Sequence, residues 1–161
     1  MVELGAFLAL VAMWAVGEAA LVPLDRPAAG TLAAASGAGL LLCHAAGIVE
    51  HLLAPHNWSG TLAAGAALAI AGIALRWWAI ATLGSGFLSR LDAPRVVTCG
   101  PYRWLRHPSE LGLALITFGT ALVLASPVAL GLGAALLPIA LIRCRRENAA
   151  LAMSSAEMRG P

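Results

Sequence analysis

The sequence predicts an all-α fold, a polytopic membrane helical bundle of about five transmembrane helices that forms one membrane domain over residues 1–161. Hydrophobic residues make up 60% of the chain and charged residues only 11%, against about 25% charged residues in an average soluble domain. A soluble protein this small could not bury so much apolar surface, so lipid is the expected solvent. The few charges are clustered in sequence, and long apolar stretches lie between them.

Two of these stretches precede residue 60. The first, from Leu4 to Leu24, is interrupted only by Glu18 and has about the 20 residues that a spanning helix needs. It lacks a basic start and a small-residue cleavage site, so we expect a retained helix rather than a signal peptide. A polar break at residues 25–27 separates it from the second stretch, Ala28 to Val49. Residues 1–60 are therefore predicted to hold two N-terminal spans.

A third span and a C-terminal helical hairpin are predicted after residue 60. Thr61 to Leu83 is apolar except for Arg76, which is expected to snorkel toward the membrane surface. After a polar segment over residues 84–107, Leu111 to Ile142 is apolar again, with Ser126-Pro127 at its middle. Each half is about 24 Å long as helix, which is short for a hydrocarbon core of about 30 Å. Flanking residues can lengthen both arms, so we predict a hairpin that turns at Ser126-Pro127. A re-entrant hairpin is the alternative.

The arginines predict the orientation in the membrane. All ten basic residues are arginine, and five spans would place the loops that carry them, and the C-terminus, on one side. By the positive-inside rule that side is cytoplasmic and the N-terminus is outside. The arginine-only, Ala- and Gly-rich composition is typical of a GC-rich bacterial genome, so we expect a bacterial inner membrane protein. A net charge of +2 is too small to predict a nucleic-acid partner.

Four ionisable residues lie within or at the ends of the predicted spans: Glu18, His44, Glu50 and His51. Such groups are costly in lipid and usually face a partner or a cavity. His44 and His51 share a helix face, so a haem or metal site is an alternative, although no further ligands are evident. Glu50 and His51 are expected at the outer interface. The three cysteines form no CxxC pair, so we predict no zinc site and no disulfide framework.

The remaining polar residues gather in two places that are expected at the same membrane face. One is residues 100–108, GPYRWLRHP, and the other is the segment from Arg143 to Glu147. Because the hairpin returns the chain to its starting side, residues near 107 and near 145 should be neighbours. Arg143 and Glu147 are four residues apart and share a helix face. Together these segments predict a pocket with a membrane-helix floor and a charged rim. The chain from Arg143 onward is expected to begin as a continuation of the last helix and to end in a polar tail over residues 152–161.

These motifs resemble the isoprenylcysteine carboxyl methyltransferase family and the wider group of membrane methyltransferases that includes phospholipid N-methyltransferases. The likeness covers about residues 70–151, where GPYRWLRHP is followed, after a hydrophobic hairpin, by R-x-x-x-E-x-x-x-L. It implies a methyltransferase-like core over residues 61–151. It also implies S-adenosylmethionine as cofactor and a lipophilic small molecule or lipid in the membrane as methyl acceptor.

The resemblance assigns roles by position. The implied cofactor-binding residues are Arg95, Val96, Val97, Tyr102, His107, Pro108, Glu110 and Glu147. Arg143 is implied as the catalytic residue that faces the substrate. The residue types suit this chemistry, because the cofactor needs a carboxylate for its ammonium group and an aromatic wall. An arginine can also orient a substrate carboxylate through two hydrogen bonds.

Three departures from the family pattern support an alternative, a non-catalytic membrane module derived from the same family. Glu110 stands where the family has tyrosine, Asn148 stands where it has a second glutamate, and the C-terminal tail has no tyrosine. A lipid or steroid reductase with a similar helical end is a third hypothesis, but no independent nicotinamide motif supports it.

Overall fold

The computed structural model describes residues 1–21, 31–56, 58, 60–84 and 97–157, and these residues form helices and no strand. The elements in order are α1 (Val2–Leu21), α2 (Thr31–Leu53), α3 (Thr61–Leu83), the 3₁₀ helix η2 (Gly100–Arg103), α4 (Pro108–Val123) and α5 (Pro127–Glu157). The predicted all-α membrane bundle is confirmed. The polar break at residues 25–27 and most of the polar segment lie outside the described residues.

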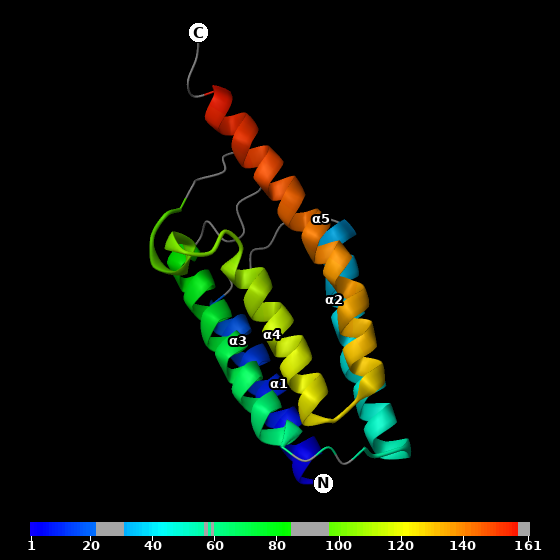
Figure 1. Ribbon diagram of the computed structural model, residues 1–161. Coiled ribbons are helices and arrows are strands. Elements are labelled where there is room, and N and C mark those ends of the chain that lie inside the picture. Colours follow the sequence, from blue (N-terminus) through cyan, green and yellow to red (C-terminus); the bar gives the residue numbers. More distant parts are fainter. Residues whose placement is uncertain (22–30, 57, 59, 85–96, 158–161) are drawn as a thin grey trace.

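Four of the five α-helices are long and apolar enough to cross a membrane: α1, α2, α3 and α5. α4 is apolar but has only 16 residues, or about 24 Å of helix, and the hydrocarbon core is about 30 Å thick. The described chain therefore holds the five predicted helices, one of them shorter than a full span. The start of α1 and the end of α5 lie at opposite ends of the bundle (Figure 1).

The predicted hairpin turns where the sequence placed it. α4 ends at Val123 and α5 begins at Pro127, so the turn contains Ser126. The Ser126 hydroxyl accepts a hydrogen bond from the amide of Ala129 at 3.0 Å, which makes Ser126 the cap of α5. Pro127 then occupies the first helical position, where its missing N–H costs nothing. Ser-Pro is thus a helix start that can be recognised from sequence.

α2 holds this turn from the side. The carboxylate of Glu50 accepts hydrogen bonds from the Ser126 hydroxyl and from the amide of Val128, the latter at 3.0 Å. A carboxylate at a helix N-terminus is also favoured by the helix dipole. One residue further on, Nδ1 of His51 lies 3.2 Å from the carbonyl oxygen of Leu124. Glu50 and His51 therefore lie at the hairpin turn, far from residue 107, as the sequence predicted.

α3 and α4 share the most extensive contact between two helices and lie side by side (Figure 1). Glycines occupy the points where their backbones come closest. The four glycines in this contact are Gly65 and Gly72 on α3 and Gly112 and Gly119 on α4. A Cβ atom added at any of them would lie 2.5–2.8 Å from the backbone of the other helix. Other glycines of the apolar helices, Gly37 and Gly131, have nothing within 4 Å of such an atom. Among the described residues, close approach of two helix backbones at glycine is therefore seen between α3 and α4.

Around this pair, α2 packs on α5 and α1 packs on α3 and α4. His44 lies between α1 and α4, with its ring against Phe7 and Trp14 and its Nε2 3.3 Å from the Thr120 hydroxyl. Histidine 44 thus has protein partners, as does His51. No group of three or more His, Cys, Asp or Glu side chains suited to a metal occurs among the described residues.

One sequence expectation is wrong and another is confirmed. Arg76 does not snorkel: its side chain is buried and forms an ion pair with Glu18 of α1. A carboxylate within reach removes the need for the guanidinium to extend to the surface. The last helix continues beyond Arg143 to Glu157, as expected, so α5 includes more than half of the tail that begins at residue 152.

Candidate active site

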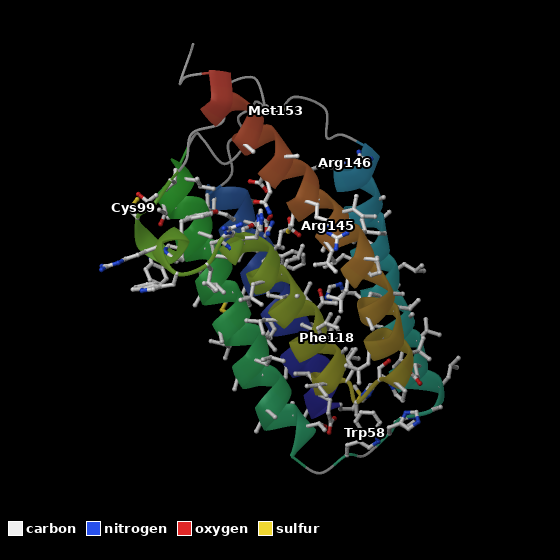
Figure 2. All side chains as sticks on the ribbon, turned by 45° about the horizontal axis from the view of Figure 1, so that its top comes forward. Trp58, Cys99, Phe118, Arg145, Arg146 and Met153 are labelled. Atoms are coloured by element: carbon white, nitrogen blue, oxygen red, sulfur yellow. The ribbon has the colours of Figure 1, made fainter. Side chains whose placement is uncertain are left out.

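The charged end of the bundle brings the two predicted segments together. Figure 2 shows Cys99, Arg145, Arg146 and Met153 at one end of the molecule and Trp58 at the other. His107 caps α4, and Pro108 opens that helix at its first position. α4 starts at this end and α5 returns to it, so the first turn of α4 faces the part of α5 that leaves the apolar region.

His107 contacts two neighbouring residues of α5. Its Nδ1 lies 3.3 Å from a carboxylate oxygen of Glu147, and its Nε2 lies 3.1 Å from the amide oxygen of Asn148. The predicted proximity of residues near 107 and near 145 is therefore confirmed. Asn148, which departs from the family pattern in the sequence, is here a hydrogen-bonding partner of His107.

Glu110 and Arg143 form a second contact between the same helices. An Nη atom of Arg143 lies 3.1 Å from a Glu110 oxygen, and both side chains are partly buried. The ion pair gives the Glu110 carboxylate a basic partner at the start of an apolar helix. Arg143 also donates to the Ser36 hydroxyl of α2 at 3.4 Å. No sequence feature marked Ser36, because one serine in an Ala- and Gly-rich helix resembles its neighbours.

The two contacts follow from helix geometry. His107 and Glu110 are three residues apart at the start of α4, and Arg143 and Glu147 are four residues apart on α5, so each pair shares a helix face. The four side chains form what we call the rim: His107, Glu110, Arg143 and Glu147. It contains two carboxylates and one guanidinium, an arrangement that suits a ligand with groups of both signs.

Tyr102 lies in η2, beside the rim. The preceding Gly100 has φ of 56°, and a Cβ atom there would lie 2.6 Å from the Thr82 hydroxyl of α3. Glycine is thus required twice, for its conformation and for this close approach. Burial and the nearby Glu147 carboxylate raise the pKa of Tyr102 to about 12, and the Arg76 guanidinium opposes them. The phenol is therefore a neutral hydrogen-bonding group at neutral pH.

The raised pKa gives a direct test of this geometry. If the pKa is about 12, about a tenth of Tyr102 is ionised at pH 11, against about nine tenths of an unperturbed tyrosine. Glu147→Gln is expected to lower the pKa, because a nearby negative charge disfavours tyrosinate. Tyr102 is the only tyrosine in the sequence, so tyrosinate absorbance reports it alone. Glu3→Gln is the control and should leave the titration unchanged. A Tyr102 pKa near 10 that Glu147→Gln does not change would contradict the burial of Tyr102 beside Glu147.

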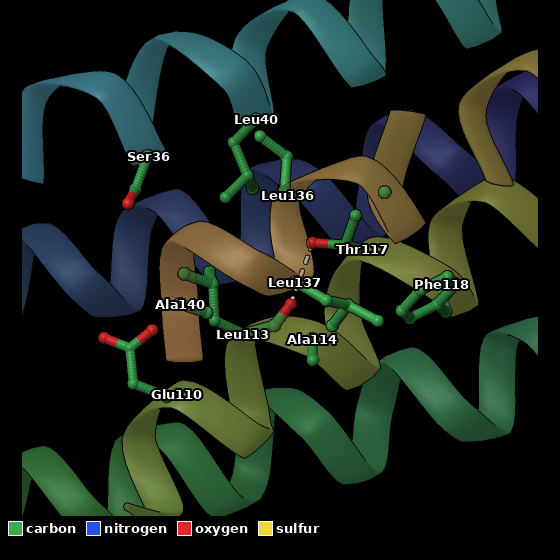
Figure 3. A pocket seen from close by; sticks show the side chains of 11 residues that line it. Ser36, Leu40, Glu110, Leu113, Ala114, Thr117, Phe118, Leu136, Leu137 and Ala140 are labelled. Carbon is green, nitrogen blue, oxygen red and sulfur yellow. Dashed lines mark hydrogen bonds between the residues drawn. The ribbon is translucent and has the colours of Figure 1, made fainter. Parts of the chain in front are cut away.

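An apolar groove runs from the rim along α4 and α5. It contains about 420 Å³ of space that protein atoms do not fill, part of it open. Figure 3 shows Glu110 and Ser36 toward one end of the groove and Phe118 toward the other. Its lining residues are Ser36, Leu40, Glu110, Leu113, Ala114, Thr117, Phe118, Gly133, Leu136, Leu137 and Ala140. Glu110 is thus shared between the groove and the rim.

Of the other predicted site residues, two lie outside the described part of the chain and two lie within it. Arg95 and Val96 lie outside the described residues, and Val97 is a half-buried residue ahead of η2. Pro108 is buried beneath the rim. Sequence reasoning did not connect Arg76 or Glu18 with this region, although both carry the signal of an ionisable residue inside an apolar span. Arg76 donates to Ser109, one residue from Glu110, at 3.0 Å.

The bundle, the groove and the rim define a helical integral membrane protein with a polar site at one end. Comparisons with known proteins agree with this class. Residues 65–153 match the model of the isoprenylcysteine carboxyl methyltransferase (ICMT) family, and the chain belongs to that family.

A curated relative, protein-S-isoprenylcysteine O-methyltransferase from Rattus norvegicus, is 38% identical over 71 residues. The alignment covers 41% of this chain, which spans 25% of the length of the relative. No solved structure matches the chain. Family membership and this relative support a membrane methyltransferase, and the rim residues lie within the matched region.

Proposed function

We propose that this protein is an S-adenosylmethionine-dependent methyltransferase that acts on a lipophilic acceptor held in the apolar groove. The observation that carries the proposal is that the rim lies at the polar end of the apolar groove, with the His107–Glu147 contact beside the Glu110–Arg143 pair. A lipid-soluble molecule with one polar end would place its chain along the groove and its polar group at the rim.

The chemistry of the rim suits the cofactor. S-adenosylmethionine has an ammonium group, a carboxylate, a sulfonium and an aromatic base, so it needs partners of both charges. Glu147 offers a partly exposed carboxylate for the ammonium group, and Tyr102 offers a neutral hydroxyl and an aromatic face. In this proposal His107, Pro108 and Glu110 complete the site from α4, and Arg95, Val96 and Val97 lie along the cofactor as the family resemblance implies.

When bound, the cofactor supplies an electrophilic methyl group, which leaves the protein with alignment and exclusion of water. Arg143 is the proposed catalytic residue, because a guanidinium can hold an acceptor carboxylate through two hydrogen bonds. Glu110 and Ser36 hold the Arg143 side chain at the mouth of the groove. The apolar lining then keeps water away from the polar group of the acceptor.

A second candidate is a non-catalytic module derived from this family. The observation that favours it is the same ion pair: Glu110, where the family has tyrosine, already occupies Arg143. An acceptor carboxylate would have to compete with Glu110 for the guanidinium. Cofactor binding is expected of the enzyme and is optional for a module that has lost the chemistry.

Titration of the purified protein in detergent with S-adenosylmethionine tests the proposal, followed by transfer of labelled methyl to a synthetic isoprenylcysteine and to a bacterial lipid extract. Saturable binding with transfer to either acceptor supports the enzyme. Binding without transfer supports the non-catalytic module. Absence of cofactor binding overturns the proposed function.

We further propose that the rim faces the cytoplasm of a bacterial cell and that the N-terminus is outside. Arg143, Arg145 and Arg146 cluster at the rim end, and the described residues of the opposite end contain no arginine. A reporter fused after Arg146 is expected to be active as a cytoplasmic fusion, and one fused after Ala54 as a periplasmic fusion. The opposite pattern for the two fusions would contradict the orientation.

A further inference from the structure

The structure contains a buried ion pair that joins the first helix to the third. Arg76 of α3 is 8% exposed and binds the carboxylate of Glu18 on α1 through two of its nitrogens, with Nε at 2.8 Å. Trp14, one turn earlier on α1, donates its indole N–H to the same carboxylate at 2.5 Å. Such a bidentate arrangement fixes the plane of the guanidinium as well as its position.

The third nitrogen of the guanidinium reaches the start of α4. Nη1 of Arg76 donates to the hydroxyl of Ser109 at 3.0 Å and to its backbone oxygen at 3.3 Å. Ser109 lies between Pro108 and Glu110, and His107 caps the same helix. Arg76 therefore contacts the first turn of α4 on the side away from α5, and the rim residues contact α5 on the other side.

The hydrogen bonds between Arg76 and Ser109 are directional, whereas apolar packing is not. The glycine interface between α3 and α4 sets the distance between the two helices along their length, and Arg76 adds a directional polar contact at the first turn of α4. A charged donor bound to a particular hydroxyl and carbonyl resists sliding and rotation of the two helices. The direction in which His107 and Glu110 point depends on this register.

We propose that Glu18 is a positioning residue of the cofactor site: it holds Arg76, and Arg76 holds the first turn of α4 that carries His107 and Glu110. The inference rests on the proposed function for the role of the site, and it makes α1 part of that site although α1 lies outside the family match over residues 65–153.

The test compares four full-length proteins in detergent: the wild type, Glu18→Gln, the exchanged pair Glu18→Arg/Arg76→Glu, and Glu50→Gln. Glu50→Gln is the matched control, because Glu50 also joins two helices through a carboxylate but does so at the hairpin turn. Three quantities are measured for each: the melting temperature, the affinity for S-adenosylmethionine, and hydrogen exchange of the amides at the start of α4.

Glu18→Gln is expected to weaken cofactor binding by about ten-fold, since it removes the charged partner that orients Arg76. The exchanged pair restores an ion pair between α1 and α3 and is expected to recover the melting temperature. It does not recover cofactor affinity, because a carboxylate at position 76 repels the Ser109 carbonyl. Glu50→Gln is expected to change affinity by less than about two-fold.

Hydrogen exchange separates failure of this inference from failure of the proposed function. Faster exchange at the start of α4 in Glu18→Gln, and not in Glu50→Gln, supports positioning even if the wild type binds no cofactor. Unchanged exchange there overturns the inference, whatever the cofactor does. Full recovery of affinity by the exchanged pair also overturns it, because the ion pair would then be only a structural link. If the exchanged pair does not fold, Ser109→Ala replaces it, with loss of affinity at an unchanged melting temperature expected.

Discussion

Replacement of Glu147 by alanine is expected to weaken binding of S-adenosylmethionine by about ten-fold or more. In the proposed site its carboxylate binds the cofactor's ammonium group, and loss of a charged hydrogen-bonding partner costs about 1.5–3 kcal/mol, where about 1.4 kcal/mol is a factor of ten. The substitution also removes the 3.3 Å contact with His107. Calorimetric titration in detergent measures the affinity.

The matched control is Glu3→Ala, which removes an exposed carboxylate at the opposite end of the bundle. Arg143→Ala provides the contrast within the rim: it is expected to reduce turnover mainly and to leave cofactor affinity near that of the wild type. Arg143→Lys keeps a charge for Glu110 but cannot bind a carboxylate in the same planar way. Unchanged affinity in Glu147→Ala would remove Glu147 from the cofactor site.

A side chain at Gly72 is expected to force α3 and α4 apart. The first added carbon would lie 2.7 Å from the backbone oxygen of Gly112 and 2.8 Å from the backbone nitrogen of Ile116. Neither atom can move without shifting a whole helix, so Gly72→Ala is expected to lower the free energy of unfolding by about 1–3 kcal/mol. Gly72→Ile adds further carbons to the same contact and is expected to prevent native packing.

Gly37→Ala is the matched control, because a carbon added there has nothing within 4 Å. It is expected to leave stability unchanged or to raise it by up to about 1 kcal/mol through helix propensity. Thermal unfolding in detergent compares the variants. Since α4 carries His107 and Glu110, loss of this packing should also reduce cofactor binding. A Gly72→Ile protein as stable as the wild type would contradict the observed interface.

Local signals predicted much of the fold. The third helix begins and ends at Thr61 and Leu83, as the apolar stretch indicated. The hairpin turns at Ser126-Pro127, because a capping serine and a proline at the first helical position are both local features. The predicted proximity of Tyr102, His107 and the end of α5 needed only the topology, since a hairpin must return its chain to the same end.

Contacts between distant segments decided the rest. Gly37, Gly65, Gly72 and Gly131 all lie in apolar helices, yet of these four only Gly65 and Gly72 meet the backbone of another helix. Composition makes all of them alike, and the choice depends on how helices rotate against one another. Arg76 was expected at the membrane surface, and its partner Glu18 lies 58 residues away.

By itself the sequence determined the membrane environment, the order of the helices, the bounds of α3, the hairpin and the end of the bundle where polar residues gather. Each of these depends on hydropathy, on caps or on spacing within one segment, which the chain carries locally. Only the tertiary structure decided which charges pair: Glu110 with Arg143, Glu147 with His107, and Glu18 with Arg76. The physical reason is that an ion pair depends on distances of about 3 Å between side chains, and such distances between separate helices arise only when the helices pack.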